Sequence, residues 1–202
     1  MTTKRRIIGL TGGISTGKTT VANYLASAYK LPILDADIYA REAVAVGTKA
    51  INAIASRYGK QILLADGSLN RQQLGAIVFN NDTERQWLEE QIHPQVRHRF
   101  IQEMKQLSTS PIVLVIPLLF EAQMTDLVTE IWVVYCSKQQ QLARLMERDG
   151  LTTEAAEARI NSQMSIEEKC DRSDIILDNS STLKALLQQV DAAIKTQNSQ
   201  LF

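Results

Sequence analysis

RIIGLTGGISTGKTT, residues 6–20, is the most informative stretch of this chain. Residues 6–10 are apolar apart from Arg6 and predict a short buried strand, whereas residues 18–28 have the pattern of a helix. Between them, residues 12–19 match the pattern G-x-x-x-x-G-K-[ST], with a strand before it and a helix after it, as this motif requires. We therefore expect a phosphate-binding loop that joins the first strand to the first helix.

The residue types of this octet suit nucleotide binding. Glycines let successive backbone N–H groups curl around a phosphate, and the helix N-terminus adds unsatisfied donors and partial positive charge. Lys18 would reach the β- and γ-phosphates, and the hydroxyl of Thr19 would bind Mg²⁺. A glycine-rich turn without function is the alternative, and the pattern does not choose between kinase, GTPase and ATPase. The predicted loop residues are Gly12, Gly13, Ile14, Ser15, Thr16, Gly17, Lys18 and Thr19.

Four further apolar runs predict strands. Residues 31–34, 112–116, 131–135 and 175–177 are short and almost wholly apolar, which is typical of parallel strands buried on both faces. They alternate with helical patterns, the last of which covers residues 182–197. We expect an α/β fold, a three-layer P-loop NTPase core with a five-stranded parallel sheet.

Two intervals lack a convincing strand. Residues 41–110 are mainly helical and are expected to cap the carboxyl edge of the sheet, where ligands bind in this architecture. Within them, a helix over residues 83–107 is predicted to break just before Pro94. Residues 148–172 are polar and helical, and they predict an exposed, mobile segment. Since no linker or repeat separates these parts, we expect a single domain.

Composition excludes several classes of protein. Among the 202 residues, 22 Lys and Arg balance 22 Asp and Glu, so no broad electrostatic field can hold nucleic acid or an anionic membrane. Two cysteines and two histidines provide neither a disulfide framework nor a metal cluster. The longest apolar stretch, residues 112–120, is too short to span a bilayer. We expect a cytoplasmic protein, a monomer or weak homo-oligomer, whose partner is a small molecule.

Two aspartates follow the second predicted strand. Asp35-Ala36-Asp37 places both carboxylates at the carboxyl end of that strand, where one can accept a proton from an attacking hydroxyl or hold Mg²⁺ through water. Asp37 also directly precedes a helix predicted over residues 38–46, so it is alternatively an N-cap. Arg41, one turn further on, would reach a phosphate, pair with Asp37, or remain a solvated charge.

These motifs together resemble the dephospho-coenzyme A kinase family. TGGIxxGKTT at residues 11–20 is followed by DADxxAR at residues 35–41. Segments that also match that family, in order, are Ile92-His93-Pro94, Pro117-Leu118-Leu119-Phe120-Glu121, Arg144…Arg148-Asp149 to Arg159…Gln163, and Asp178-Asn179. One departure is Ser15, where the family usually has a third glycine. Serine does not adopt a positive φ freely, so we expect a slightly less accommodating loop.

The resemblance implies an ATP- and Mg²⁺-dependent kinase that phosphorylates the ribose 3′-hydroxyl of dephospho-coenzyme A to give coenzyme A. This would be the final step of coenzyme A biosynthesis. It also implies a nucleotide-binding core over about residues 1–40, 110–147 and 172–202. A helical acceptor-binding insertion over about 41–109 and a small helical lid over about 148–171 would complete the domain.

The same resemblance suggests roles for single residues. Arg144 and Arg148, one turn apart on a helix, would close over the ATP phosphates, and Asn179 would contact the adenine edge. Asp37 would be the catalytic base, with Lys18 and Arg144 as the other catalytic groups. The implied acceptor-binding residues are Asp37, Arg41, His93, Leu118, Glu121, Arg159 and Gln163. Structural alternatives stay open: exposed helix charges for the arginines, a strand-to-helix corner for residues 117–121, packing for His93 and a turn for Asn179.

Two other functions compete with this hypothesis. A different small-metabolite or nucleotide kinase would share the same core, and only its acceptor would differ. A GTP-dependent switch would carry an Asn-Lys-x-Asp tetrapeptide that reads guanine, and the sequence contains none.

Overall fold

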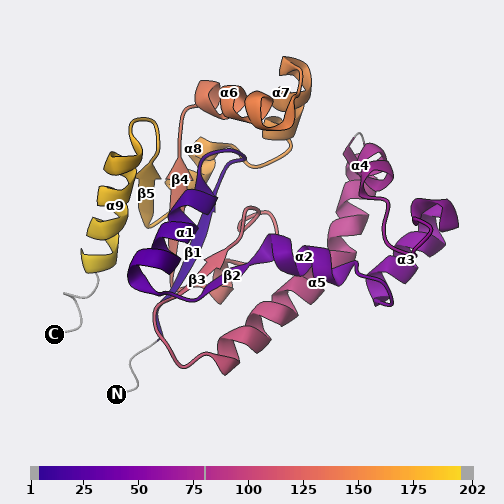
Figure 1. Ribbon diagram of the computed structural model, residues 1–202, viewed down its shortest axis with the longest axis horizontal. Coiled ribbons are helices and arrows are strands. Elements are labelled where there is room, and N and C mark those ends of the chain that lie inside the picture. Colours follow the sequence, from indigo (N-terminus) through magenta and orange to yellow (C-terminus); the bar gives the residue numbers. More distant parts are fainter. Residues whose placement is uncertain (1–4, 80, 197–202) are drawn as a thin grey trace. The chain divides into compact units, whose positions relative to one another are not determined.

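The computed structural model describes residues 5–79 and 81–196. They fall into two compact units (Figure 1). The first contains the described residues up to Leu34 and from Leu107 onward, and the second contains Asp35–Gln106. In the described part of the chain, no helix is long and apolar enough to cross a membrane.

A five-stranded parallel sheet with the order β2-β3-β1-β4-β5 forms the centre of the first unit, which confirms the predicted sheet. β1 lies in the middle, with Leu10 beside Val115 on one side and Trp132 on the other. Because the strands are parallel, their carboxyl ends share one edge, the edge at which such sheets bind ligands. The strands are β1 (Ile7–Gly12), β2 (Ile33–Asp35), β3 (Ile112–Val115), β4 (Glu130–Tyr135) and β5 (Ile175–Asp178).

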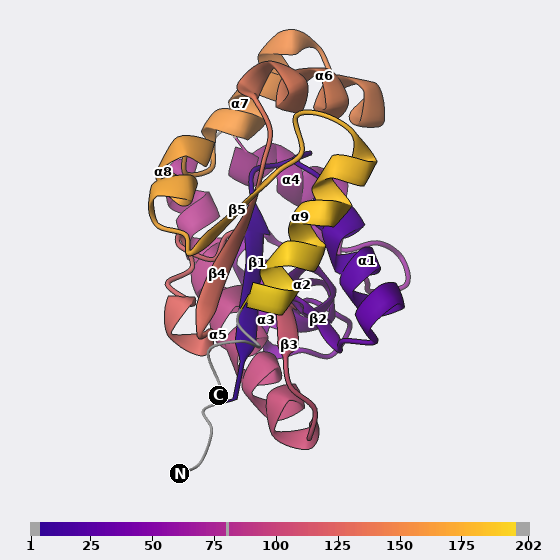
Figure 2. The same cartoon turned by 90° about the vertical axis from the view of Figure 1, so that its left-hand side faces the viewer.

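Two helices cover one face of this sheet. α1 (Lys18–Tyr29) and α9 (Leu183–Thr196) lie side by side against it, with Leu10 and Trp132 fully buried beneath them (Figure 2). The predicted end of α9 at Gln197 lies outside the described residues. The hydroxyls of Tyr24 and Tyr29 each donate to Oδ1 of Asp191 at 2.7 Å, which links the two helices at their surface.

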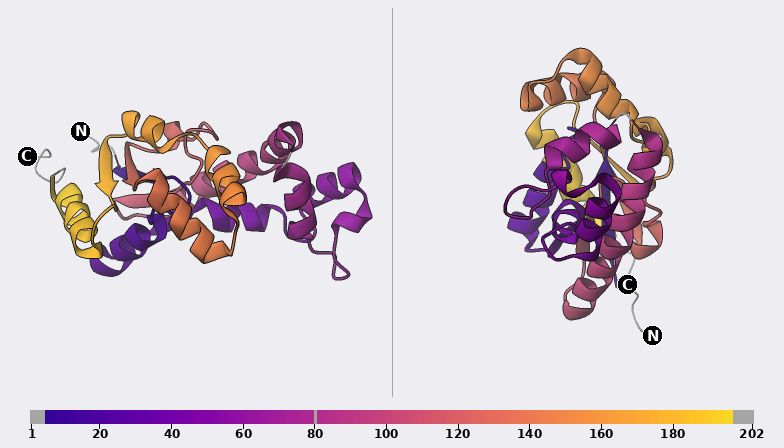
Figure 3. Two further views of the ribbon diagram at one scale, coloured as in Figure 1. Left: turned by 90° about the horizontal axis from the view of Figure 1, so that it is seen from above. Right: turned by 90° about the vertical axis from the view of Figure 1, so that its right-hand side faces the viewer.

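The other face is covered by the chain that follows β3 and by a short helix. Gly9 packs so closely here that a Cβ would lie 3.0 Å from Val128 and 3.3 Å from Leu119. η2 (Thr125–Leu127) contacts β1, and α8 (Ile166–Asp171) contacts β4 on the side opposite α1 and α9 (Figure 2). α6 (Lys138–Asp149) and α7 (Thr153–Asn161) pack against each other (orange in Figure 3).

The second unit is helical, as predicted for this part of the chain. Its apolar core is centred on Ile51, Ile54, Ile62 and Leu74. α5 contacts α2, α3 and α4, and the rings of Tyr39 and Phe100 meet edge to face with centroids 5.0 Å apart. The elements are α2 (Ala36–Ala43), α3 (Lys49–Tyr58), η1 (Lys60–Ile62), α4 (Arg71–Phe79) and α5 (Asp82–Gln106).

The interpretation of Asp37 as an N-cap is wrong. α2 begins at Ala36, and the carboxylate of Asp35 accepts a hydrogen bond of 2.8 Å from the backbone N–H of Asp37. Asp35 has the extended backbone of a cap, with φ −119° and ψ 119°, so the helix starts directly at the strand end. Asp37 therefore lies in the first helical turn with an exposed side chain.

The predicted helix break at Pro94 is also wrong, because α5 runs through it without interruption. Pro94 has no N–H to donate to the carbonyl of Glu90. Next to it, the side-chain amide of Gln95 donates to the carbonyl of Gln91 at 3.1 Å. The buried side chains of Val96 and Phe100 hold the following turns in place. Packing thus outweighs a local cost of about 3 kcal/mol.

A charged cluster on the second unit generates a pH prediction. The guanidinium of Arg57 donates to both carboxylate oxygens of Glu84 at 2.7 and 2.9 Å, and the hydroxyl of Tyr58 donates to the same carboxylate. Hydrogen bonds from Arg57, and then from Tyr58, lower the pKa of Glu84 from 4.5 to about 2. Since the folded pKa is depressed, this stabilisation is complete above pH 4.5 and is lost as the pH falls towards 2.

Glu84→Gln removes the titrating group while keeping its shape. We expect the variant to unfold more easily than the wild type at neutral pH, and the difference to shrink as the pH falls from about 4.5 to about 2. Urea unfolding at a series of pH values, followed by circular dichroism, measures this difference. A difference that stays constant down to pH 2 would show that the hydrogen bonds do not depress the pKa of Glu84.

Candidate active site

The loop between β1 and α1 has glycines where a side chain has no space. Gly12 has φ +146° and Gly17 has φ +106°, values that L-residues rarely adopt. A Cβ on Gly12 would collide with the carbonyl oxygen of Val134 on β4, and a Cβ on Gly17 would collide with the side-chain amide of Asn179. The loop therefore lies directly against the carboxyl ends of β4 and β5.

Ser15, which stands where the family usually has a glycine, adopts a backbone conformation that suits glycine better than serine. Its φ is +59°, in the left-handed region, and its Oγ is buried without a hydrogen-bond partner among the described residues. Such a conformation costs on the order of 1 kcal/mol or more for a residue with a Cβ. The loop thus contains local strain at the position where a glycine would have none.

Three side chains hold the loop in shape. Nζ of Lys18 donates to the carbonyls of Gly12 and Gly13 at 2.9 and 2.7 Å, and Oγ1 of Thr16 donates to the carbonyl of Gly13 at 3.0 Å. Nδ2 of Asn179 donates to the carbonyl of Thr16 at 2.8 Å. These contacts use carbonyls of the loop as acceptors, and the N–H of Thr16 also donates to the carbonyl of Gly13 at 3.4 Å. α1 has no side-chain cap at its N-terminus, which is the arrangement of a helix that binds an anion.

The arginines predicted to form a lid lie in two places. Nη2 of Arg144 on α6 donates to the carbonyl of Asn179 at 3.0 Å, which places this cation beside the phosphate loop. Arg148 donates to both carboxylate oxygens of Asp149 at 2.7 and 3.1 Å, and Arg159 on α7 donates to the same carboxylate at 2.8 Å. Hydrogen bonds from Arg148, assisted by the charge of Arg159, lower the pKa of Asp149. This carboxylate joins α6 to α7.

Lys169 is a site residue that sequence reasoning missed. Its side chain is fully buried, and its Nζ donates to the carbonyl of Pro117 at 2.8 Å and to Oε1 of Glu121 at 2.9 Å. Oε1 of Glu121 also accepts from the backbone N–H of Met164 at 2.9 Å. The expectation that residues 148–172 form an exposed segment is therefore wrong for α8. The sequence signal was the capping box of Ser165 and Glu168, which marks a real helix start.

A cavity of about 320 Å³ lies between the phosphate loop and the α7–α8 segment. Gly13, Gln141 and Gln163 line it, and Nζ of Lys138 donates to Oδ1 of Asn161 at 3.1 Å on the same wall. Oε1 of Gln163 is buried without a partner among the described residues. Gln163 and Gly13 of the glycine loop thus line the same cavity.

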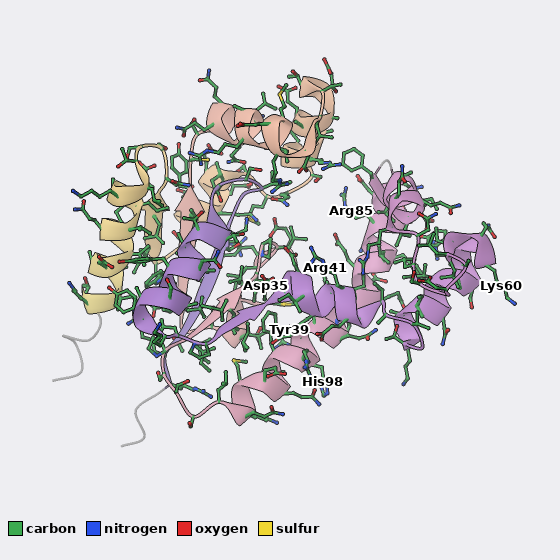
Figure 4. The ribbon with its side chains drawn as sticks, viewed as in Figure 1. Asp35, Tyr39, Arg41, Lys60, Arg85 and His98 are labelled. Carbon is green, nitrogen blue, oxygen red and sulfur yellow. The ribbon has the colours of Figure 1, made fainter. Side chains whose placement is uncertain are left out.

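The predicted acceptor-binding residues of the second unit are only partly brought together. Asp37 and Arg41 line one cavity of this unit, and Figure 4 shows Arg41 on α2, six residues beyond Asp35. His93 is half-buried on α5 and is not part of that lining, although its neighbour Ile92 is. Burial lowers the pKa of His93, against a smaller opposing effect of Glu89, so its imidazole is neutral at pH 7. In the first unit, Leu118 is half-buried and forms the corner after β3 with Glu121.

The described residues contain no group of three or more His, Cys, Asp and Glu side chains suited to hold a metal ion. The hydroxyl of Thr19 lies exposed in the first turn of α1. A Mg²⁺ ion that is bound through one hydroxyl and the phosphates of its nucleotide needs no protein cage. The residues present therefore fit a metal that arrives with the nucleotide.

Comparisons with known proteins identify the family of this chain. The family model for dephospho-CoA kinase matches residues 6–185. A dephospho-CoA kinase of Trichormus variabilis is 67% identical over 191 residues, covering 94% of this chain and 97% of the relative. Among solved structures, TT1252 from Thermus thermophilus has a TM-score of 0.80 at 30% identity, covering 99% of this chain and 100% of that one. A dephospho-CoA kinase from Campylobacter jejuni has a TM-score of 0.71 at 29% identity, covering 97% and 98%.

The buried pair of Lys169 and Glu121 generates a stability prediction. Lys169→Met leaves the partly buried carboxylate of Glu121 without its cation, so we expect the free energy of unfolding to fall by about 3–5 kcal/mol. Adding Glu121→Met removes the unpaired charge and should restore more than half of this loss. Urea unfolding of the wild type, both single variants and the double variant measures the coupling. Additive losses in the double variant would show that the two side chains are energetically independent.

Proposed function

Because this chain belongs to the dephospho-CoA kinase family, we propose that it transfers the γ-phosphoryl group of ATP to the ribose 3′-hydroxyl of dephospho-coenzyme A. The products are coenzyme A and ADP, in the final step of coenzyme A biosynthesis. The observation that carries the proposal is the phosphate loop, whose glycines face the ends of β4 and β5, in a chain matched by the family model over residues 6–185.

We assign the nucleotide phosphates to residues 12–19. The N–H groups of the loop and of the α1 N-terminus would bind the phosphate oxygens, and Nζ of Lys18 would exchange its backbone contacts for the β- and γ-phosphates. We assign Mg²⁺ to the hydroxyl of Thr19. When bound, the ion neutralises charge on the β- and γ-phosphate oxygens. Since phosphoryl transfer leaves little covalent chemistry to the protein, positioning and charge stabilisation supply most of the rate.

The lid is assigned to about residues 148–171, with Arg144 at its base. Arg144 would stabilise charge on the transferring group, an effect worth roughly 10³–10⁵ in rate in other phosphotransferases. Arg148 would join it when water is excluded, whereas Arg159 and Gln163 are assigned to the acceptor. The side-chain N–H of Asn179 donates to the carbonyl of Thr16 in the loop, so its Oδ1 would accept a hydrogen bond from the adenine edge.

The acceptor is assigned to the insertion, about residues 41–109, and to the chain after β3. Asp37 would accept the proton of the ribose hydroxyl, which is a weak nucleophile while protonated. Its place in the first turn of α2, beyond the cap of Asp35, supports this role. Arg41 and His93 from the insertion, with Leu118 and Glu121 from the corner after β3, would complete the acceptor site. We place the reaction in the cytoplasm and expect a monomer or weak homo-oligomer.

An acceptor panel tests the function directly. With ATP and Mg²⁺, the purified protein should convert dephospho-coenzyme A to coenzyme A, and AMP, shikimate and gluconate should be far poorer acceptors. Coupled measurement of ADP release, with chromatography of the product, gives kcat/KM for each. A higher kcat/KM for AMP or shikimate would contradict the assigned substrate while leaving the kinase fold intact.

Asp37→Asn tests the base. The substitution keeps the shape of the side chain and leaves the cap of Asp35 untouched, but it removes the proton acceptor. We expect kcat to fall by about 10²–10⁴, because a positioned general base contributes that much, whereas KM for ATP and thermal stability change little. Steady-state kinetics and thermal melting measure both effects. An unchanged kcat would move the search for the base to Asp35 or Glu121.

A further inference from the structure

The chain around α8 is held to the corner after β3 through one carboxylate oxygen. Oε1 of Glu121 accepts hydrogen bonds from Nζ of Lys169 and from the backbone N–H of Met164, each at 2.9 Å. Met164 lies just before α8 and Lys169 lies within it. Between them, the capping box of Ser165 and Glu168 fixes the start of the helix. We call Glu121, Met164 and Lys169 the Glu121 clamp.

The side chain of Met164 is held at the same corner. Nη1 of Arg172 lies 3.8 Å from Sδ of Met164, and the guanidinium of Arg172 lies over the ring of Phe120, 4.4 Å from its centroid. Phe120 directly precedes Glu121 in sequence. Backbone and side chain of Met164 are therefore both connected to the corner after β3.

Lys169 also connects this corner to the phosphate loop. The carbonyl of Pro117 accepts from Nζ of Lys169 at 2.8 Å and from Oγ1 of Thr11 at 3.2 Å. Thr11 is buried and directly precedes Gly12, the first glycine of the loop. One ammonium thus lies two hydrogen bonds away from the residue at which the loop begins.

Gln163 connects the clamp to the loop from the other side. It directly precedes Met164 in sequence and lines the cavity of about 320 Å³ together with Gly13. Its Oε1 is buried and has no hydrogen-bond partner among the described residues, so this oxygen does not fix the side chain. The position of Gln163 therefore depends on the backbone next to it, which the Glu121 clamp holds at Met164.

The packing of α8 does not by itself explain a lysine at position 169. The side chain of Lys169 is fully buried, on a helix that contacts β4. Replacing a buried ion pair by well-packed apolar residues is often neutral or stabilising, because burial of two charges costs desolvation. An apolar residue would therefore hold α8 against the sheet as well as Lys169 does. The ion pair adds direction, because its hydrogen bonds have a preferred geometry.

We propose that Lys169 is a positioning residue of the transfer reaction. It acts through Glu121 to fix the backbone at Met164, and so keeps Gln163 at the wall of the cavity beside the phosphate loop. This rests on the function proposed above, in which Gln163 contacts the acceptor and about residues 148–171 form the lid. A lid whose C-terminal side is fixed to the core excludes water from the reacting phosphate better than one that is loose there.

Lys169→Met tests this role, at a temperature where circular dichroism shows the variant to be folded. We expect kcat/KM for dephospho-coenzyme A to fall by about 10- to 100-fold, because small displacements cost that much in a positioned reaction, with little change in KM for ATP. Since a loosened lid admits water, ATP hydrolysis without acceptor should rise relative to transfer. Amide hydrogen exchange of the peptide that contains Met164 should become faster.

Two control variants separate positioning from stability and from loss of charge. Leu186→Ala destabilises the fully buried core under α9 without touching the Glu121 clamp. Lys184→Met makes the same substitution as Lys169→Met at an exposed position. Both should keep the wild-type ratio of ATP hydrolysis to transfer.

A double variant, Lys169→Met with Glu121→Met, separates the two effects further. It should regain much of the stability lost in Lys169→Met, because the unpaired carboxylate is gone. The N–H of Met164 still lacks its acceptor, so exchange should stay fast and the ratio of hydrolysis to transfer should stay high. If Lys169→Met does not fold, the double variant decides by these two measurements.

The outcomes distinguish this inference from the proposed function. If the wild type phosphorylates dephospho-coenzyme A and Lys169→Met matches Leu186→Ala in kcat/KM, in the ratio of hydrolysis to transfer and in exchange at Met164, the inference alone is overturned. Wild-type exchange and a wild-type ratio in the double variant would also overturn it. If the wild type does not phosphorylate dephospho-coenzyme A, the proposed function itself fails.

Discussion

The close approach of the phosphate loop to the ends of β4 and β5 is the constraint on which the site depends. Gly12 lies against the carbonyl of Val134, and Gly17 lies against the side chain of Asn179, so neither position has space for a Cβ. Asn179 fixes the loop through the carbonyl of Thr16 and offers its own carbonyl to Arg144. The order of the strands thereby determines the site. Because β4 is next to β1, Arg144 on α6, the helix that follows β4, lies near the loop that follows β1.

Carboxylates organise the cations around this loop. Asp149 binds Arg148 and Arg159, which connects α6 to α7, and Glu121 binds the buried Lys169, which connects the corner after β3 to α8. The carbonyl of Pro117 accepts from both Lys169 and Thr11. The charged residues of α6, α7 and α8 are thus held in place by ion pairs. Pairing offsets the desolvation cost of a charge that is buried in a protein interior.

The second unit combines an apolar core with a cavity beside it. The ion pair between Arg57 and Glu84 lies outside the cavity beside Arg41, whereas Leu69 and Leu74 of the apolar core line it. The lining of this cavity combines apolar side chains with Arg41 and Arg71. The short segment from Asp35 to Arg41 carries the proposed base and one of these cations on a single helix, so that both are positioned by the same cap.

The sequence alone determined the five strands, the loop and its glycines, because buried parallel strands are continuously apolar and a phosphate loop has a fixed spacing of glycines and lysine. It also determined the expected strain at Ser15, whose φ is +59°. Only the tertiary structure decided the cap at Asp35, the uninterrupted helix at Pro94 and the burial of Lys169. The cap at Asp35 is local, but the sequence offers two neighbouring aspartates and does not choose between them. The helix through Pro94 and the burial of Lys169 depend on partners far along the chain, such as Tyr39 for Phe100 and Pro117 for Lys169. From the sequence, Lys169 is expected to be a solvated charge. In the structure, its Nζ contacts Pro117 and Glu121, which are 52 and 48 residues away in sequence.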